Sequence, residues 1–295
     1  MKILCTHPGR YGDILWALPT VRALSEAYEQ PVEFLTSPRY APICPLIAQQ
    51  PYIAAADEAV EWAIQESAPI TPQQPPWSGA SDMYTFDAVY HLGYTAWPRP
   101  TLAQDVYDRA LRQHRTRAAI PPLDLATPWI TATNMIMPRA EQPRVWLGWS
   151  EEHFELKVGL TLLLAARFPD VEFWWIRPDL QSRYDEADHR YPSLAGWQHM
   201  LGYNVTMIRA NWQTTAALAQ SCWCYLGCLS APWVLANALG IPCVVMEPNR
   251  DRHHPVFWSD GGGGRNVLVE GNDGQPTWDA RHTGDALESV LRGLT

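Results

Sequence analysis

The sequence predicts an α/β protein made of two Rossmann-like domains, and three observations lead to this fold class. Short apolar runs alternate with helical patterns along most of the 295 residues. Runs such as Ile3-Leu4-Cys5 do not alternate with polar residues, which is typical of strands buried on both faces of a parallel sheet. The chain is also long for a single core, so we expect two domains, at residues 1–140 and 141–280.

The first half of the sequence is expected to form strands at 2–6, 31–35, 56–60 and 87–92. Helical patterns lie at 14–24 and at 102–112, and the segment 40–50, which prolines interrupt, is expected to be helical or irregular. Pro19 falls within the first of these helices and should tilt or kink it without ending it. Prolines at 67–82 predict a loop, and the segment 118–143 is expected to be the domain linker.

The second half repeats the alternation, which indicates another parallel sheet with helices on both faces. Its strands are expected at 144–149, 171–176, 223–226 and 243–246. Its helices are expected at 158–168, 214–220, 232–239 and 283–292.

The amino-terminal segment combines a strand, a loop with two glycines and the start of a helix. Gly9 and Gly12 permit unusual backbone angles and leave room for a ligand. Asp13 follows, and the chemistry alone favours its interpretation as an N-cap that accepts a hydrogen bond from an amide of the first turn. The other interpretation is a catalytic base, because the positive end of a helix dipole favours the charged form of a carboxylate.

Composition narrows the class of protein. A net charge of −9 and an isoelectric point near 5.4 give no general electrostatic basis for binding a phosphate backbone, so nucleic acid is not an expected partner. No apolar run approaches the length of a membrane span, and no charged leader precedes the first strand, so we expect a soluble, cytoplasmic protein. Of the 15 tryptophans, we expect most to fill the core and some to line a binding surface.

The six cysteines lie mostly in apolar, strand-like surroundings and are expected to be buried, reduced thiols. The alternative is a metal site made by Cys222, Cys224 and Cys228. Their spacing matches neither a zinc ribbon nor a zinc finger, and no histidine is adjacent. We therefore expect no metal and no cofactor.

Four motifs follow one another along nearly the whole chain. They are the glycine loop with Gly12-Asp13-Ile14-Leu15, Ala17-Leu18-Pro19 and Arg22-Ala23-Leu24; the run FDAVYHL at 86–92; the strand VWLGW at 145–149 with Lys157; and the segment 214–245, which ends in ALGIPCVV. In this order they resemble glycosyltransferase family 9, the ADP-heptose:lipopolysaccharide heptosyltransferases. The resemblance implies the GT-B architecture, in which two Rossmann-like domains with parallel sheets face each other across a cleft. It also implies that a last helix, at 281–295, returns to the first domain.

The resemblance further implies residue roles. Asp13 would be the base that deprotonates an acceptor hydroxyl in an inverting reaction, and Gly12 would lie beside the donor. Lys157 and Ser150 would bind the donor diphosphate, and Asp179 the nucleoside. Without the family, Lys157 could equally be a solvated lysine ahead of a helix. The chain has no Asp-x-Asp motif of the kind that holds a metal in GT-A enzymes, so a metal-independent reaction is expected.

The chain departs from the family at Leu229-Ser230-Ala231, where the family has Asp-Thr-Gly, and at Val234, where it has histidine. Ser230 keeps a hydroxyl at the start of a helix, where a phosphate can bind. Glu247, after the last clear strand, is a candidate for contacting the donor in compensation. The donor sugar and its nucleotide therefore stay open.

The acceptor surface is expected in the segment 67–100, where Trp77, Tyr94 and Trp97 could stack on a sugar. The sequence thus predicts a glycosyltransferase that moves a heptose-like or other hexose from a nucleotide diphosphate sugar to a glycan or other hydroxyl acceptor. One alternative is a catalytically silent GT-B protein that binds a nucleotide sugar. Another is a phage-type GT-B enzyme that glycosylates a modified nucleobase in DNA.

Overall fold

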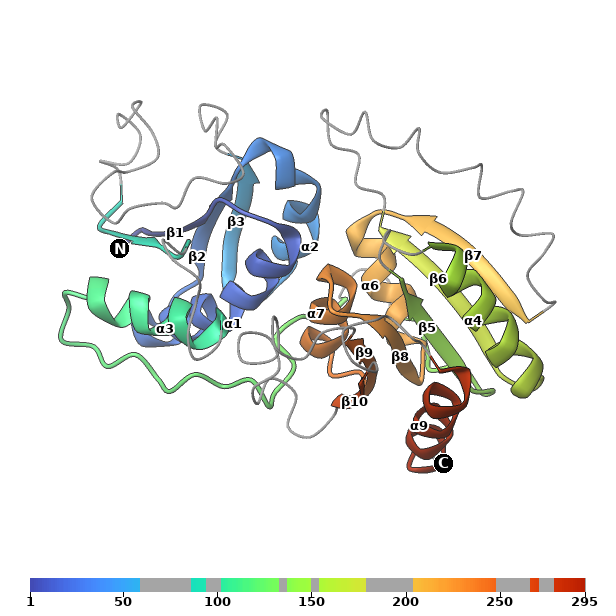
Figure 1. Ribbon diagram of the computed structural model, residues 1–295. Helices are drawn as coiled ribbons and strands as arrows, with labels where there is room; N and C mark the ends of the chain where they lie inside the picture. Colours follow the sequence, from blue (N-terminus) through green and yellow to red (C-terminus); the bar gives the residue numbers. More distant parts are fainter. Residues whose placement is uncertain are drawn as a thin grey trace.

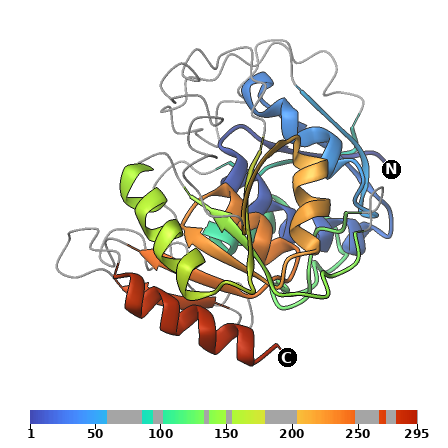
Figure 2. The ribbon, with the colours of Figure 1, turned by 90° about the vertical axis from the view of Figure 1, so that its right-hand side faces the viewer.

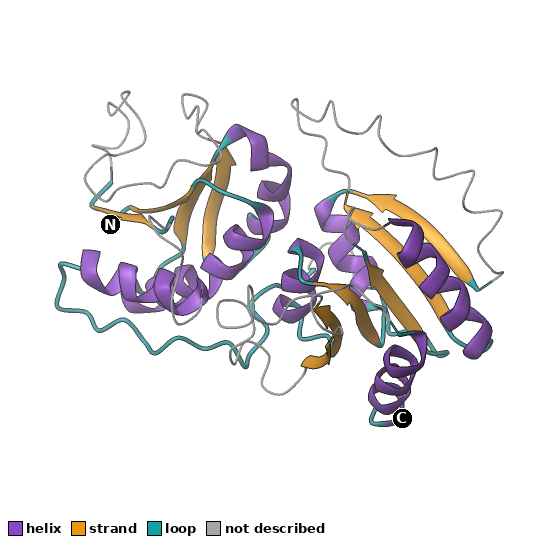
Figure 3. Ribbon diagram, viewed as in Figure 1, coloured by secondary structure: helices purple, strands orange, loops and turns teal. Residues whose placement is uncertain are grey.

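The computed structural model describes residues 1–58, 86–93, 102–132, 137–149, 154–178, 204–247, 266–270 and 279–294. These residues form two parallel sheets flanked by helices (Figure 1, Figure 3). One sheet comes from the first half of the chain, here the described residues up to 132, and the other from the second half, the described residues from 137 onward. The predicted proline-rich loop at 67–82 lies outside the described residues.

The first sheet has four parallel strands in the order β3-β2-β1-β4. They are β1 (Ile3–His7), β2 (Val32–Thr36), β3 (Ile53–Glu58) and β4 (Ala88–His91). All five residues of β1 are buried, as its unbroken apolar run predicted. The chain order of the strands reverses between β1 and β4. In open α/β sheets, ligands bind beyond the carboxyl ends of the strands at such a switch point.

Four helical segments accompany this sheet: α1 (Tyr11–Tyr28), a 3₁₀ helix (Pro38–Ile43), α2 (Cys44–Ile47) and α3 (Leu102–Gln113). As predicted, α1 continues through Pro19. Proline has no N–H to donate to the carbonyl four residues earlier, which is that of Leu15. The indole Nε1 of Trp129 donates to that carbonyl instead, at 3.0 Å, so the carbonyl is satisfied although the proline interrupts the helical ladder.

The second sheet has six parallel strands in the order β7-β6-β5-β8-β9-β10. They are β5 (Arg144–Gly148), β6 (Glu172–Pro178), β7 (Val205–Ala210), β8 (Cys224–Cys228), β9 (Cys243–Glu247) and β10 (Asn266–Glu270). The order is that of a doubly wound dinucleotide-binding sheet, with the switch point between β5 and β8. The sequence had indicated the four inner strands, whereas the two edge strands, β7 and β10, were missed.

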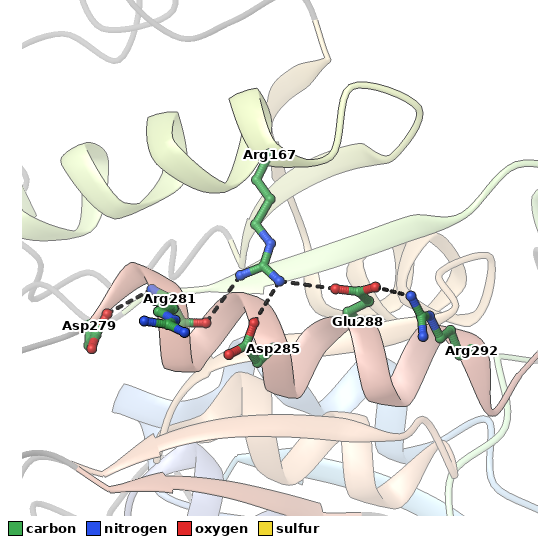
Figure 4. Close-up of polar contacts among 6 residues, drawn as sticks. All are labelled: Arg167, Asp279, Arg281, Asp285, Glu288 and Arg292. Atoms are coloured by element: carbon green, nitrogen blue, oxygen red, sulfur yellow. Dashed lines mark hydrogen bonds and ion pairs between the residues drawn. The ribbon is translucent and has the colours of Figure 1, made fainter.

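The helices of the second half are α4 (Phe154–Arg167), α6 (Trp212–Gln220), α7 (Ala231–Ala238) and α9 (Ala280–Arg292). The expectation that the last helix returns to the first domain is corrected here, because α9 packs against α4 and the strands β8, β9 and β10 (Figure 1, Figure 2). Arg167 of α4 donates to Asp285 at 2.7 Å, to Glu288 at 3.0 Å and to the carbonyl of Arg281 at 3.2 Å (Figure 4). These contacts join the two helices at a largely exposed surface.

One apolar core joins the two halves. Trp16 of α1 packs against Trp129, with ring centroids 5.5 Å apart, and against Trp233 of α7 at 5.8 Å. The backbone amides of Trp129 and Ile130 both donate to the carbonyl of Ala238 at the end of α7. The predicted linker therefore contacts both halves in this region. Helix α1 packs against α7 of the second half as well as against the strands of its own sheet.

All six cysteines are buried and form no disulfide. Burial raises the pKa of the Cys44 and Cys222 thiols to about 12, so both stay protonated. Among the described residues, no three histidine, cysteine or carboxylate side chains are grouped so that they could hold a metal ion. Within the same residues, no helix combines the length and the apolar character that crossing a bilayer requires.

Candidate active site

Asp13 lies in the first turn of α1 and is not its N-cap. The helix begins at Tyr11, because the amide of Ile14 donates to the carbonyl of Arg10 at 3.0 Å. Arg10 occupies the cap position and makes no side-chain capping bond. Asp13 is 8% exposed, so its carboxylate is largely sheltered at the positive end of a long helix. The N-cap interpretation is therefore wrong, and this position is compatible with a base.

The loop from β1 to α1 is braced by a buried histidine. The Nδ1 atom of His7 lies 3.2 Å from the carbonyl oxygen of Gly9 and 3.3 Å from its amide nitrogen. The carbonyl of His7 accepts from Thr36 Oγ1 at 2.9 Å. Burial lowers the pKa of His7 to about 3, so the imidazole is neutral near neutral pH. These contacts fix the path of the chain that leads to Asp13.

The amino termini of α1 and α7 meet between the two sheets. A Cβ atom placed on Gly12 would lie 3.5 Å from Val234 Cγ2, 3.6 Å from the Cα of Ala231 and 3.8 Å from its nitrogen. Ser230 is the N-cap of α7 but makes no side-chain capping bond. Two positive helix ends thus lie side by side, one carrying Asp13 and the other carrying the Ser230 hydroxyl.

The carboxyl ends of β5 and β8, at the switch point of the second sheet, are joined by Tyr225. Its hydroxyl lies 3.0 Å from the carbonyl oxygen of Gly148 on β5 and 2.8 Å from that of Cys228 on β8. Ser230 Oγ is 3.5 Å from the same hydroxyl. The sequence interpretation did not single out this tyrosine. The available signal was a glycine near the end of each of two buried strands, Gly148 and Gly227.

Lys157 is buried within α4, at 1% exposure, and is not a solvated lysine ahead of the helix. Its carbonyl accepts from Thr161 Oγ1 at 2.7 Å, and this hydroxyl in turn accepts from Trp149 Nε1 at 3.0 Å. Helix α4 follows β5 in the chain, so Lys157 belongs to the connection that leaves the switch point of the second sheet. A fully buried ammonium group is uncommon in proteins, because its burial is costly unless the group is paired with an opposite charge.

Comparisons of sequence and of structure give different outcomes for this chain. No protein-family model matches it, and no curated protein sequence matches it. Solved structures, by contrast, do match this chain. A glycosyl transferase family 9 protein from Veillonella parvula superimposes with a TM-score of 0.67 at 12% identity, over 99% of this chain and 97% of that chain. E. coli ADP-heptose lps heptosyltransferase II gives a TM-score of 0.64 at 13% identity, over 99% of both chains. E. coli heptosyltransferase WaaC with ADP gives 0.63 at 11% identity, over the full length of both.

This is the GT-B fold of the family 9 glycosyltransferases. The fold resemblance that the motifs indicated is therefore confirmed for the whole chain. Sequence identities of 11–13% show a shared fold but do not show that individual residues have the same role.

The departures from the family 9 motif have a structural consequence. Val234, where the motif has histidine, is 3% exposed and its Cγ2 faces Gly12. That position is used here for apolar packing between α7 and α1. The structure does not describe the side chains of the remaining predicted site residues. Glu247 ends β9, and nothing is described of its side chain. Five predicted site residues lie outside the described residues: Ser150, Asp179, Trp77, Tyr94 and Trp97.

Proposed function

We propose that this protein is a glycosyltransferase that moves a sugar from a nucleotide diphosphate sugar to an acceptor hydroxyl, with Asp13 as the general base. The observation that carries the proposal is the meeting of two helix amino termini at the junction of the sheets. One of them bears a sheltered carboxylate, Asp13, and the other bears a hydroxyl, Ser230. A transferase of this kind needs a base for the acceptor and positive groups for a departing diphosphate.

The reaction follows from these groups. Asp13 takes the proton of the acceptor hydroxyl as that oxygen attacks the anomeric carbon of the donor. The bond from this carbon to the phosphate oxygen breaks, so the configuration inverts and the electron pair leaves with the nucleoside diphosphate. The amide groups at the start of α7, the Ser230 hydroxyl and the Lys157 ammonium group stabilise the negative charge of the leaving group. No step requires a metal ion.

The two ligands are assigned to different halves. The acceptor lies mainly against residues 1–140, with Trp77, Tyr94 and Trp97 as stacking groups, and the donor against residues 141–280. In the donor half, Gly12 approaches from α1, and Ser150, Asp179 and Glu247 complete the candidate set. The ADP in the E. coli heptosyltransferase structure of the same fold supports a nucleoside diphosphate as the leaving group.

A catalytically silent donor-binding protein is the second candidate, and the apolar residues Leu229 and Val234 at the start of α7 favour it. Both candidates bind a nucleotide sugar, so turnover separates them. Release of nucleoside diphosphate that disappears in Asp13→Ala would exclude the silent protein.

The test of the base is Asp13→Asn, which keeps the shape of the side chain and removes its basicity. With water as the acceptor, release of nucleoside diphosphate from the best-bound donor should fall by about 100-fold or more. Donor affinity, measured by isothermal titration calorimetry, should change less than about twofold, because the base acts on the acceptor side.

Asp170→Asn is the matched control. Asp170 is exposed and immediately precedes the β6 region, at the amino edge of the second sheet, opposite the proposed site. This variant should keep both turnover and affinity. A loss of donor affinity in Asp13→Asn as large as its loss of turnover would contradict the base assignment.

A further inference from the structure

Tyr225 stands out as a buried polar group with no role in the reaction described above. It is fully buried on β8, and its ring packs edge-on against Trp146 of β5, with centroids 5.2 Å apart. Its hydroxyl reaches the carbonyl oxygens at the carboxyl ends of both strands, those of Gly148 and Cys228. The phenol therefore lies near Ser230, the N-cap of α7, whose Oγ is 3.5 Å from the Tyr225 hydroxyl.

The space around the ring is kept open by two glycines. A Cβ atom on Gly148 would lie 2.1 Å from Tyr225 Cε2, and one on Gly227 would lie 2.5 Å from the hydroxyl oxygen. Neither separation is possible for real atoms, so a side chain at either position would displace the tyrosine. The two strand ends are thus shaped to admit this ring and its hydroxyl.

The hydrogen bonds at the Cys228 carbonyl involve two donors. Ser230 Oγ donates to this carbonyl at 3.2 Å, and the single proton of the Tyr225 hydroxyl can be donated either to it, at 2.8 Å, or to the Gly148 carbonyl, at 3.0 Å. Burial raises the pKa of the Tyr225 phenol well above its ordinary value, so the hydroxyl keeps its proton. If Ser230 turns away, the Tyr225 hydroxyl can still donate to the Cys228 carbonyl, so this acceptor keeps a donor.

Ser230 matters because the start of α7 offers few other donors. From Leu229 to Val234 the side chains are apolar apart from Ser230 and Trp233, and the Trp233 indole donates to Asn266 Oδ1 at 3.0 Å. Pro232 has no amide hydrogen, which removes one donor from the first turn. An anion at this helix end would therefore depend strongly on the Ser230 hydroxyl.

We propose that Tyr225 is a positioning residue for the donor diphosphate: its hydroxyl holds the Cys228 carbonyl so that Ser230 can release this carbonyl and donate to a phosphate oxygen. The proposal rests on the proposed function, because it assumes a nucleoside diphosphate at the start of α7. Tyr225 itself touches no ligand. It acts through Ser230, at the place where the chain lacks the polar residues of the family 9 motif.

The test compares Tyr225→Phe with Tyr107→Phe by isothermal titration with ADP, GDP, UDP, CDP and dTDP. Phenylalanine fills the same space as tyrosine, so both variants should fold, which circular dichroism verifies. Tyr107 is the matched control, because its hydroxyl, on a side chain that is largely buried, also donates to a backbone carbonyl, that of Pro121 at 2.7 Å in the first half. Tyr225→Phe should weaken binding of the preferred diphosphate about tenfold, and Tyr107→Phe less than about twofold.

Ser230→Ala, alone and combined with Tyr225→Phe, shows whether the tyrosine acts through the serine. The double variant should bind no more weakly than Ser230→Ala alone, because the two residues form one path. Equal affinity in Tyr225→Phe and Tyr107→Phe would overturn the proposal and leave the proposed function standing, as would fully additive losses in the double variant. If the wild-type protein binds none of the five diphosphates, the proposed function fails and this proposal falls with it.

Discussion

At the scale of single residues, the burial of Lys157 adds a structural observation to its place in a sequence motif. Its ammonium group is one of the few charged groups that are fully buried among the described residues. In the proposed reaction it binds the negatively charged diphosphate of the donor.

We therefore expect Lys157→Met to weaken binding of the preferred nucleoside diphosphate about tenfold, which corresponds to about 1.4 kcal/mol. Methionine keeps the apolar stem of the side chain, so stability should change little. Lys157→Ala should lose affinity to the same degree and stability in addition, because it leaves a cavity. Titration calorimetry and urea unfolding measure the two effects. An unchanged dissociation constant in both variants would count against the phosphate role.

His7 predicts how stability depends on pH. Its folded-state pKa is lowered to about 3, whereas an unfolded histidine has a pKa near 6.5. Between these values the unfolded chain binds a proton that the folded chain does not, so stability is lost as the pH falls below 6.5. The contribution of His7 should reach about 2 kcal/mol between about pH 6.5 and about pH 5. Burial also lowers the pKa of His91, which adds to the loss.

His7→Asn removes this titration, so urea unfolding at about pH 6.5 and about pH 5 should show a smaller difference than in the wild-type protein. Because the asparagine side chain can still contact the backbone of Gly9, the variant should fold. An acid destabilisation identical to that of the wild type would show that His7 does not titrate as its burial implies.

The residues of the candidate site were predictable to different degrees. Asp13 followed from its motif, although its place in the first turn rather than at the cap depends on where the helix starts. Tyr225 could not be identified, because a tyrosine in an apolar strand is indistinguishable in sequence from an ordinary core residue. Its importance comes from two carbonyls that are brought together only by the pairing of β5 with β8.

At the scale of secondary-structure elements, the packing of α1 against α7 places the two halves of the site together. A Cβ atom on Gly12 would be in ordinary van der Waals contact with Val234 and Ala231. The space beside Gly12 therefore accommodates a methyl group but not a larger side chain.

Gly12→Ala should accordingly be as stable as the wild type or gain up to about 1 kcal/mol, because alanine favours the helix. Gly12→Val should lose about 1–3 kcal/mol, since its methyl groups would overlap α7. Urea unfolding measures the difference. Equal stability of the two variants would contradict the close approach of α1 and α7.

The inner strands of both sheets were predictable because continuous apolar runs have few other interpretations. The edge strands β7 and β10 were not. In β7, the sequence VTMIRA mixes polar and apolar residues, and only Val205 is buried. Such a segment is held as a strand by its pairing with β6 over six residues, which is a tertiary interaction that the local sequence does not report.

At the scale of the whole molecule, a single core connects the sheets. Its residues include Trp16 from the first half, Trp233 from the second and Trp129 from the segment between them. More than a hundred positions separate Trp16 from the other two, so no local pattern could show that they meet. This core sets the relation between Asp13 and Ser230, and with it the geometry that the proposed reaction requires.

The central claim is that this junction binds a nucleotide diphosphate sugar. The most direct measurement is the thermal unfolding midpoint of the wild-type protein and of Lys157→Met in the presence of ADP-, GDP-, UDP-, CDP- and dTDP-sugars. At least one donor should raise the wild-type midpoint in a saturable manner, and the rise should be smaller in Lys157→Met. A wild-type midpoint that none of these donors raises, at concentrations up to about 1 mM, would contradict the claim.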